Sequence, residues 1–207
     1  MRTALKRLLA EGAVGEITAV VAGKGSRTSR THGGWLADPA SGGGWLLFLG
    51  SHLIDQVLWL LGGEVRQVQA EMTLAPTGVD ETTFFTMRFD SGIRADLIVS
   101  KQVGVSFDYV EVLGTAGRAR AETTSMLLEV QSSALTAYKS PASVRMLDDP
   151  RRPMYMAELL EFAAAIREDR EPAITGKDGL RVLEVIDAVF ASAKTGRPVQ
   201  LGTAAAV

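Results

Sequence analysis

The sequence contains no cysteine among its 207 residues. This absence excludes disulfide bonds, cysteine-ligated zinc, iron–sulfur clusters and cysteine nucleophiles together. Histidine is nearly as scarce, because only His32 and His52 occur, so a metal centre built on three histidines is excluded as well. Any acid–base chemistry must therefore use one of two imidazoles or the carboxyl groups.

Positive charge is not in excess either. The chain has 22 Lys and Arg against 24 Asp and Glu, a net charge of -2 and an isoelectric point near 5.8. Without a basic field to hold a phosphate backbone, we expect no nucleic-acid partner. The longest apolar run, residues 46–61, is interrupted by His52 and Asp55 and is shorter than the roughly 20 residues of a membrane span. We therefore expect no membrane segment and a cytoplasmic protein.

The composition is that of an ordinary globular protein. Hydrophobic residues make up 46% and charged residues 22% of the chain, and the mean hydropathy is +0.12. These values exclude an intrinsically disordered chain, and the length suffices for one hydrophobic core. We expect residues 1–207 to form a single domain.

Hydrophobic periodicity divides the chain into three parts. The first holds a helix over residues 3–11, a strand over 17–22, a polar glycine-rich loop over 23–44 and a largely buried helix over 51–61 that Ser51 would cap. Between residues 65 and 147 apolar residues alternate with period two, which predicts sequential antiparallel strands joined as hairpins. The last third predicts helices over 155–168 and 178–194.

Helices that flank a run of strands indicate an α+β fold. We expect a large, mostly antiparallel but mixed, open sheet with helices packed on one face. Apolar residues alternate on both faces of the predicted strands, and one layer of helices covers only one face. The other face is therefore expected to mediate self-association into a homodimer or a higher homo-oligomer.

The glycine clusters do not form a nucleotide site. Gly23-Lys24-Gly25 and Gly42-Gly43-Gly44 lie in or beside the loop, and neither has the dinucleotide or P-loop spacing between a strand and a helix. We expect this chain alone to bind no cofactor.

His52 is the candidate catalytic base. Its expected place in the first turn of a buried helix would favour a neutral imidazole, although a hydrogen-bonded core histidine remains the alternative. Asp55 follows one helical turn later and either contacts His52 or stabilises the helix N-terminus. A serine-protease-like triad of Ser51, His52 and Asp55 is excluded, because neighbouring side chains on a helix point apart.

One segment carries a family resemblance. The string GGGWLLFLGSHLIDQVLWLLGG, residues 42–63, resembles the sugar-binding domain of the Gfo/Idh/MocA oxidoreductases, whose members read G-G-G-x-L-x-D-x-G-x-H-x-x-D. EGAVGEI, WLADPASGGG, RFDSGIRADLIVS and the segment 166–201 also match, in family order. The resemblance implies an NAD- or NADP-dependent enzyme that oxidises a sugar or polyol, with the family histidine at His52. As candidate substrate-binding residues we take His52, Asp55, Arg30 and Trp35.

Two departures from the family pattern stand out. The family's N-terminal Rossmann domain, with its dinucleotide fingerprint and E-K-P motif, has no counterpart in this sequence, and Phe48 occupies the usual aspartate position. Phenylalanine cannot accept a hydrogen bond from a substrate hydroxyl. The sequence thus predicts the substrate half of an oxidoreductase that is truncated, or completed by a separate Rossmann-domain partner, and inactive alone. The alternative is a non-catalytic sugar-binding or dimerisation module.

Overall fold

The protein is described by a computed structural model that covers residues 1–26, 34–134, 142–145 and 151–202. The candidate Arg30 and the second histidine, His32, lie outside these residues. The helices of the described part are α1 (Arg2–Ala10), η1 (Trp35–Ala37), η2 (Pro39–Ser41), η3 (Leu46–Gly50), α2 (Ser51–Leu61), α3 (Arg151–Arg167) and α4 (Gly176–Thr195). The strands are β1 (Ile17–Gly25), β2 (Val65–Leu74), β3 (Asp80–Phe89), β4 (Arg94–Ser100), β5 (Phe107–Gly114), β6 (Gly117–Glu122), β7 (Leu127–Ser132), β8 (Ala142–Arg145) and β9 (Val199–Gln200).

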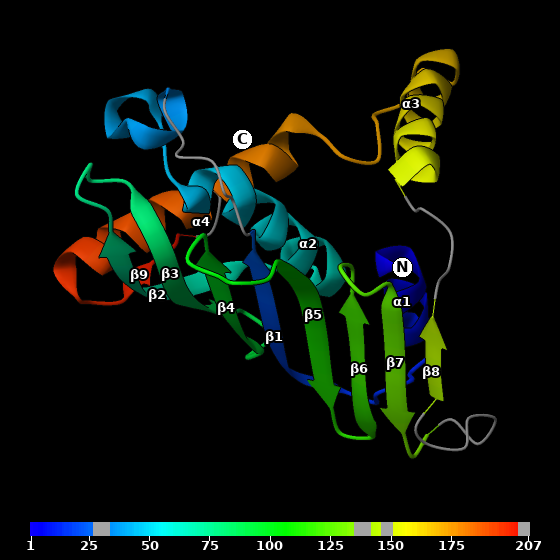
Figure 1. The fold of residues 1–207 in the computed structure, drawn as a ribbon. Helices are drawn as coiled ribbons and strands as arrows, with labels where there is room; N and C mark the ends of the chain where they lie inside the picture. The colour runs from blue at the N-terminus through cyan, green and yellow to red at the C-terminus, as the bar shows by residue number, and fades with distance from the viewer. Residues whose placement is uncertain (27–33, 135–141, 146–150, 203–207) are drawn as a thin grey trace.

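All of these strands belong to one open sheet, in the order β8-β7-β6-β5-β1-β4-β3-β2-β9 (Figure 1). β1 runs parallel to β4, and the other neighbouring pairs are antiparallel. The predicted mixed, mostly antiparallel α+β fold is confirmed. The predicted unbroken series of hairpins is wrong at one place, because β1 lies between β4 and β5.

Small residues allow β1 to occupy this central place. Val20 and Ala22 are buried under the helices, while Gly23 and Gly25 lie on the opposite face. A Cβ atom on Gly23 would come within 3.0 Å of the side chains of Phe107, Tyr109 and Ile98. The aromatic rings of β5 thus lie across the space that the glycines leave.

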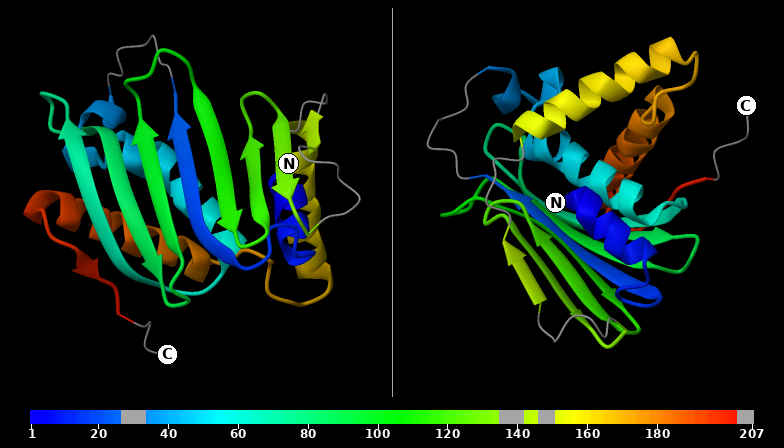
Figure 2. Two further views of the ribbon diagram at one scale, coloured as in Figure 1. Left: turned by 90° about the horizontal axis from the view of Figure 1, so that it is seen from below. Right: turned by 90° about the vertical axis from the view of Figure 1, so that its right-hand side faces the viewer.

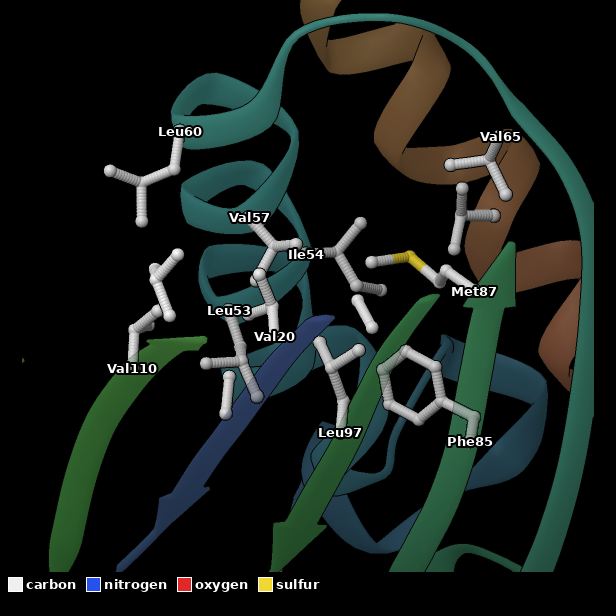
Figure 3. Close-up of a cluster of buried hydrophobic side chains, with 14 of the residues drawn as sticks. Val20, Leu53, Ile54, Val57, Leu60, Val65, Phe85, Met87, Leu97 and Val110 are labelled. Carbon is white, nitrogen blue, oxygen red and sulfur yellow. The ribbon is translucent and has the colours of Figure 1, made fainter. Parts of the chain in front are cut away.

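The helices α1, α2 and α4 cover one face of the sheet (Figure 2). α2 packs across β1, α4 across β2, and α1 against β6. The apolar face of α2 presents Leu53, Ile54 and Val57, all fully buried, to strands from the middle of the sheet (Figure 3). Burial of each such side chain contributes about 1.5–3 kcal/mol, so this layer contact forms the core.

The helix that carries His52 begins before Ser51. A π-helical segment, Leu46–Gly50, leads directly into α2, and Gly50 itself has helical backbone angles. The predicted N-cap at Ser51 is therefore wrong. The start of the helix is fixed from outside: the buried Asp80 carboxylate on β3 accepts hydrogen bonds from the backbone N–H groups of Trp45 (3.0 Å) and Leu46 (2.7 Å). A carboxylate from the sheet thus replaces the expected local cap.

Gly44 makes room for this carboxylate. Its φ angle is +119°, and a Cβ atom there would collide with Asp80 Oδ1. A side chain at position 44 would be strained and would displace the carboxylate from the helix start.

One stretch, Pro39–Leu61, is long and apolar enough to cross a membrane, but 44% of its most apolar window is buried in the fold. The core helix of a soluble protein passes the same test, and the buried side of α2 packs on the sheet.

α3 stands apart from the helix layer (Figures 1 and 2). We expected this helix to pack on the sheet with the others, and that expectation is wrong. Its large apolar side chains are 57–69% exposed, although Ala165 is buried; they are Tyr155, Met156, Leu159, Leu160, Phe162 and Ile166. An apolar helix surface of this kind is typical of a contact with another domain or chain.

The outer face of the sheet is divided between apolar and charged regions. On β3, Phe84 is 55% exposed. On β5 and β6, Arg118 and Arg120 form ion pairs with Glu111. Charged side chains thus accompany the apolar side chains that we expected on this face.

The role of Asp80 can be tested by truncation. We expect Asp80→Ala to lower the free energy of unfolding by about 2 kcal/mol, because two buried N–H groups lose their acceptor. Urea denaturation followed by circular dichroism measures the change. Glu71→Ala, an exposed carboxylate on the neighbouring strand, is the matched control and should have little effect. Equal stability of the two variants would contradict the anchoring role.

Candidate functional site

His52 lies at the edge of a cleft between two helices. The cleft has a volume of about 720 Å³ and is bounded by the start of α2 and the start of α4. The His52 side chain is exposed, so the alternative of a buried core histidine is excluded. Since helical turns precede it from Leu46 onward, His52 does not occupy the first turn of its helix, and that expectation is wrong.

Asp55 lies in the same cleft, one turn beyond His52. Its carboxyl is half-buried, and burial is the main cause that raises its pKa above the ordinary aspartate value. The nearby Asp178 carboxylate raises the pKa further, whereas His52 lowers it. A cleft carboxyl with a perturbed pKa is a candidate for proton transfer. His52 and Asp55 are thus the predicted residues that the fold brings together.

The opposite wall of the cleft comes from the first turns of α4. Thr175 and Asp178 form a capping box: Asp178 accepts from the Thr175 backbone N–H at 2.7 Å and from its hydroxyl at 2.8 Å. Gly176 and Gly179 have nothing within 4 Å of a would-be Cβ, so the backbone of α4 is bare here. The remaining lining consists of Ser51, next to His52, and of four apolar side chains, Ile174, Leu180, Val182 and Leu183.

Trp35, on η1, belongs to a second group of side chains. This group is centred on Phe48, which precedes His52 by about one helical turn. The ring of Phe48 packs edge-on against Trp35, with centroids 6.0 Å apart, and against Trp45, at 5.7 Å. Trp45 is buried, while Phe48 is 41% and Trp35 51% exposed. The two exposed rings border the start of the helix that carries His52.

Sequence reasoning missed the α4 side of the cleft. The spacing of Thr175 and Asp178 is a capping-box signal that would have placed the start of α4 there, but nothing in the sequence indicates that this helix start faces His52. The role of Asp80 was missed as well, because its partners lie 34 and 35 residues away along the chain.

Neither a metal nor a dinucleotide fits the described part of the chain. Its His, Asp and Glu side chains form no cluster suited to a metal ion. The next described helix after β1 is the short η1, and the start of α4 is occupied by its own capping box.

The raised pKa of Asp55 leads to a pH-dependent prediction. A carboxyl whose pKa is higher in the folded state binds its proton more tightly there, so its ionisation opposes folding. This loss of stability is absent below the pKa that the carboxyl has in the unfolded chain, about 3.9. It develops as the pH rises through the higher pKa of the folded state. We expect Asp55→Asn to be more stable than the parent at pH 7, with no advantage at pH 3.5.

Urea denaturation of both proteins at several pH values measures this difference. Asp187→Asn removes an exposed carboxylate of α4 and is the matched control. If both variants change stability equally at pH 7, the environment assigned to Asp55 is wrong.

Comparison with known proteins identifies the family. Residues 3–120 match the GFO/IDH/MocA C-terminal domain. The uncharacterized oxidoreductase YrbE of Bacillus subtilis is 30% identical over 173 residues, which cover 77% of this chain and 48% of the relative. D-Xylose 1-dehydrogenase (NADP(+)) 2 of Haloferax volcanii is 27% identical over 169 residues, which cover 79% of this chain and 50% of the relative.

The crystal structure of aldose–aldose oxidoreductase from Caulobacter crescentus, complexed with glycerol, superposes with a TM-score of 0.83 at 26% identity and covers 97% of this chain and 60% of that one. The chain thus spans about half the length of the curated relatives it matches. The matched family domain and the shared fold together show that the chain belongs to the GFO/IDH/MocA family of oxidoreductases.

Proposed function

We propose that this chain is the substrate-binding half of an NAD- or NADP-dependent oxidoreductase that acts on a CH–OH group of a sugar or polyol. The single observation that carries the proposal is the cleft between α2 and α4, which is lined by both His52 and Asp55 of α2. The relatives support the reaction class, since one is an NADP-linked xylose dehydrogenase and another an aldose oxidoreductase.

His52 would act on the reacting hydroxyl. An imidazole can accept the hydroxyl proton as the carbon is oxidised, and a nicotinamide, when bound, accepts the hydride. Asp55, whose pKa is raised, is placed one turn away to exchange a proton with the imidazole or the solvent. Arg30 and Trp35 remain proposed substrate contacts.

The exposed apolar side of α3 supports the proposal that a second domain completes the protein. The residues that hold the cofactor would belong to this domain, either on the same polypeptide or on a separate chain. Packing against α3 would remove its exposed apolar side chains from water, at about 25 cal/mol per Å². We expect the complete protein to be cytoplasmic.

A non-catalytic sugar-binding or dimerisation module is the second candidate. Phe48 favours it, because a ring packed against Trp35 and Trp45 offers no hydrogen bond to a substrate or to His52.

A fusion protein separates the two candidates. We would join the half of Bacillus subtilis YrbE that this chain does not match to residues 1–207, and follow reduction of NAD and NADP with D-xylose and myo-inositol. We expect turnover with at least one pair, and a loss of about 100-fold in kcat for His52→Gln, as is typical of a lost general base.

Glu184→Gln, an exposed change on α4, is the matched control and should retain full activity. The chain without the fused half should give no turnover. A folded fusion that binds the cofactor but shows no turnover, or an active His52→Gln variant, would favour the non-catalytic module.

We propose in addition that two copies associate through the outer face of the sheet. Phe84 on β3 is exposed on this face and lines a groove of about 570 Å³ with residues of β2 and β4, among them Glu71, Arg94 and Asp96. A second copy would cover Phe84, while the ion pairs of Arg118 and Arg120 are already satisfied within one chain.

Sedimentation velocity at micromolar concentration tests the oligomer. We expect a dimer or a higher oligomer for the parent and a monomer for Phe84→Arg, because a charge in the centre of an apolar interface must be desolvated without a partner. Leu160→Arg introduces the same charge on the exposed side of α3 and should leave the oligomer intact. Dissociation by Leu160→Arg alone would instead place the interface on α3.

A further inference from the structure

We propose that Asp178 of α4 is a positioning residue of the candidate site, which holds Asp55 of α2 in its protonated form across a small cavity that both side chains line. This inference rests on the proposed function, because it concerns the proton chemistry of the same site. Asp55 lines the His52 cleft as well as this cavity, so it connects the two. Asp178 therefore acts on the cleft through Asp55.

The cavity lies in the seam between α2 and α4. Its volume is about 90 Å³, much less than the 720 Å³ of the His52 cleft. Three charged side chains, Asp55, Asp178 and Arg181, line it together with apolar side chains such as Leu58 and Trp59. A space this small holds few water molecules, so charges on its walls are screened less than charges on an open surface. The two carboxyl groups are thus placed where one influences the other.

The local contacts of Asp178 keep its carboxyl ionised. Its Oδ2 atom accepts hydrogen bonds from the backbone N–H of Thr175 at 2.7 Å and from the Thr175 hydroxyl at 2.8 Å. These hydrogen bonds, the backbone one first, lower the pKa of Asp178 below the ordinary aspartate value, and the charge of Arg181 lowers it further. A negative charge is thus fixed in the first turn of α4.

Asp55 has the opposite environment. Burial is the main cause that raises its pKa, and the charge of Asp178 adds to this effect, while His52 on the same helix acts in the other direction. When two carboxyl groups share a cavity and their pKa values are pushed apart, one carries the proton and the other the charge. Asp55 is therefore the proton carrier of the pair.

Arg181 is the positive group of the cavity. Its guanidinium donates to the backbone carbonyl of Gly63 at 3.0 Å and forms an ion pair with Glu64, just beyond the end of α2. Because this ion pair directs the guanidinium to a carboxylate outside the cavity lining, Arg181 offsets the repulsion between the two aspartates only in part. The charged groups that face Asp55 are thus His52 from its own helix, and Asp178 and Arg181 from α4.

A protonated Asp55 gives the cleft a proton source. In the direction that reduces a carbonyl group, hydride transfer from a reduced nicotinamide leaves an alkoxide oxygen, which takes its proton from the imidazolium of His52. Asp55 can then return a proton to the imidazole, and its carboxylate takes up a proton from water. The charge of Asp178 favours the protonated state of Asp55 from which this sequence starts.

NMR titration of the chain tests the proposal without any need for turnover. The chain is labelled with 13C at its aspartate carboxyl groups, and Asp55→Asn identifies the Asp55 signal. In the parent we expect Asp55 to titrate above the ordinary aspartate value of about 3.9. In Asp178→Asn, which removes the neighbouring charge, we expect the Asp55 midpoint to move to lower pH. Circular dichroism over the same pH range establishes that each protein is folded.

Three further variants separate the charge of Asp178 from its part in the helix start. Thr175→Ala weakens the capping box but keeps the Asp178 charge, so it should not lower the Asp55 midpoint. Asp178→Glu keeps the charge and should titrate like the parent. Asp187→Asn removes an exposed carboxylate of the same helix, which is the same change in net charge, and should leave the Asp55 midpoint where it is.

An Asp55 midpoint that is unchanged in Asp178→Asn, or that falls equally in Thr175→Ala, would overturn the proposal. These outcomes are separate from those of the fusion experiment. A fusion that turns over and loses activity in His52→Gln would keep the proposed function standing while the role of Asp178 fails. A fusion without turnover would remove the proposed function while the measured coupling of the two carboxyl groups stands.

Discussion

The site depends on the hydrogen bonds that the Asp80 carboxylate accepts from the backbone N–H groups of Trp45 and Leu46, at the start of the helix that carries His52. Asp80 is only 1% exposed and belongs to a strand that is itself fixed in the sheet. Burial raises the pKa of its carboxyl, and the N–H groups of Leu46 and Trp45 partly offset that cost. Phe48, which lies on this helix, is placed in space through that contact.

The contact also explains the glycines in front of the helix. At Gly44 the backbone approaches the carboxylate so closely that no side chain fits. The π-helical segment that follows widens one turn of the helix before the regular α2 begins. Such segments are frequent at functional sites, and here the segment carries Phe48, the residue that departs from the family pattern.

Two exposed apolar surfaces lie on different sides of the molecule. α3, with its exposed apolar side chains, stands on the helix side of the sheet (Figure 2). Phe84 is exposed on β3, on the outer face of the sheet. One partner cannot readily cover both surfaces. The proposed cofactor-holding domain on the helix side and the proposed second copy on the sheet side would account for the two surfaces separately.

The candidate site was readable from the sequence only in part. His52 and Asp55 could be placed together because four residues make one helical turn, which is a local rule. The raised pKa of Asp55 could not be predicted, because it arises from burial and from Asp178, a carboxylate 123 positions further along the chain that α4 brings near. The position of the Phe48 ring could not be predicted either, because it depends on packing against Trp35, which belongs to another helix.

For the fold, the sequence by itself determined the helices, the strands and their mixed α+β arrangement, because these follow from local periodicity. Only the tertiary structure decided that β1 inserts between β4 and β5, that the helix begins at Leu46 instead of Ser51, and that α3 stands apart. The physical reason is the same in each case. Alternation and helical spacing record which face of a segment avoids water, but strand neighbours, a cap from a distant strand and an uncovered helix depend on contacts between residues far apart in the chain.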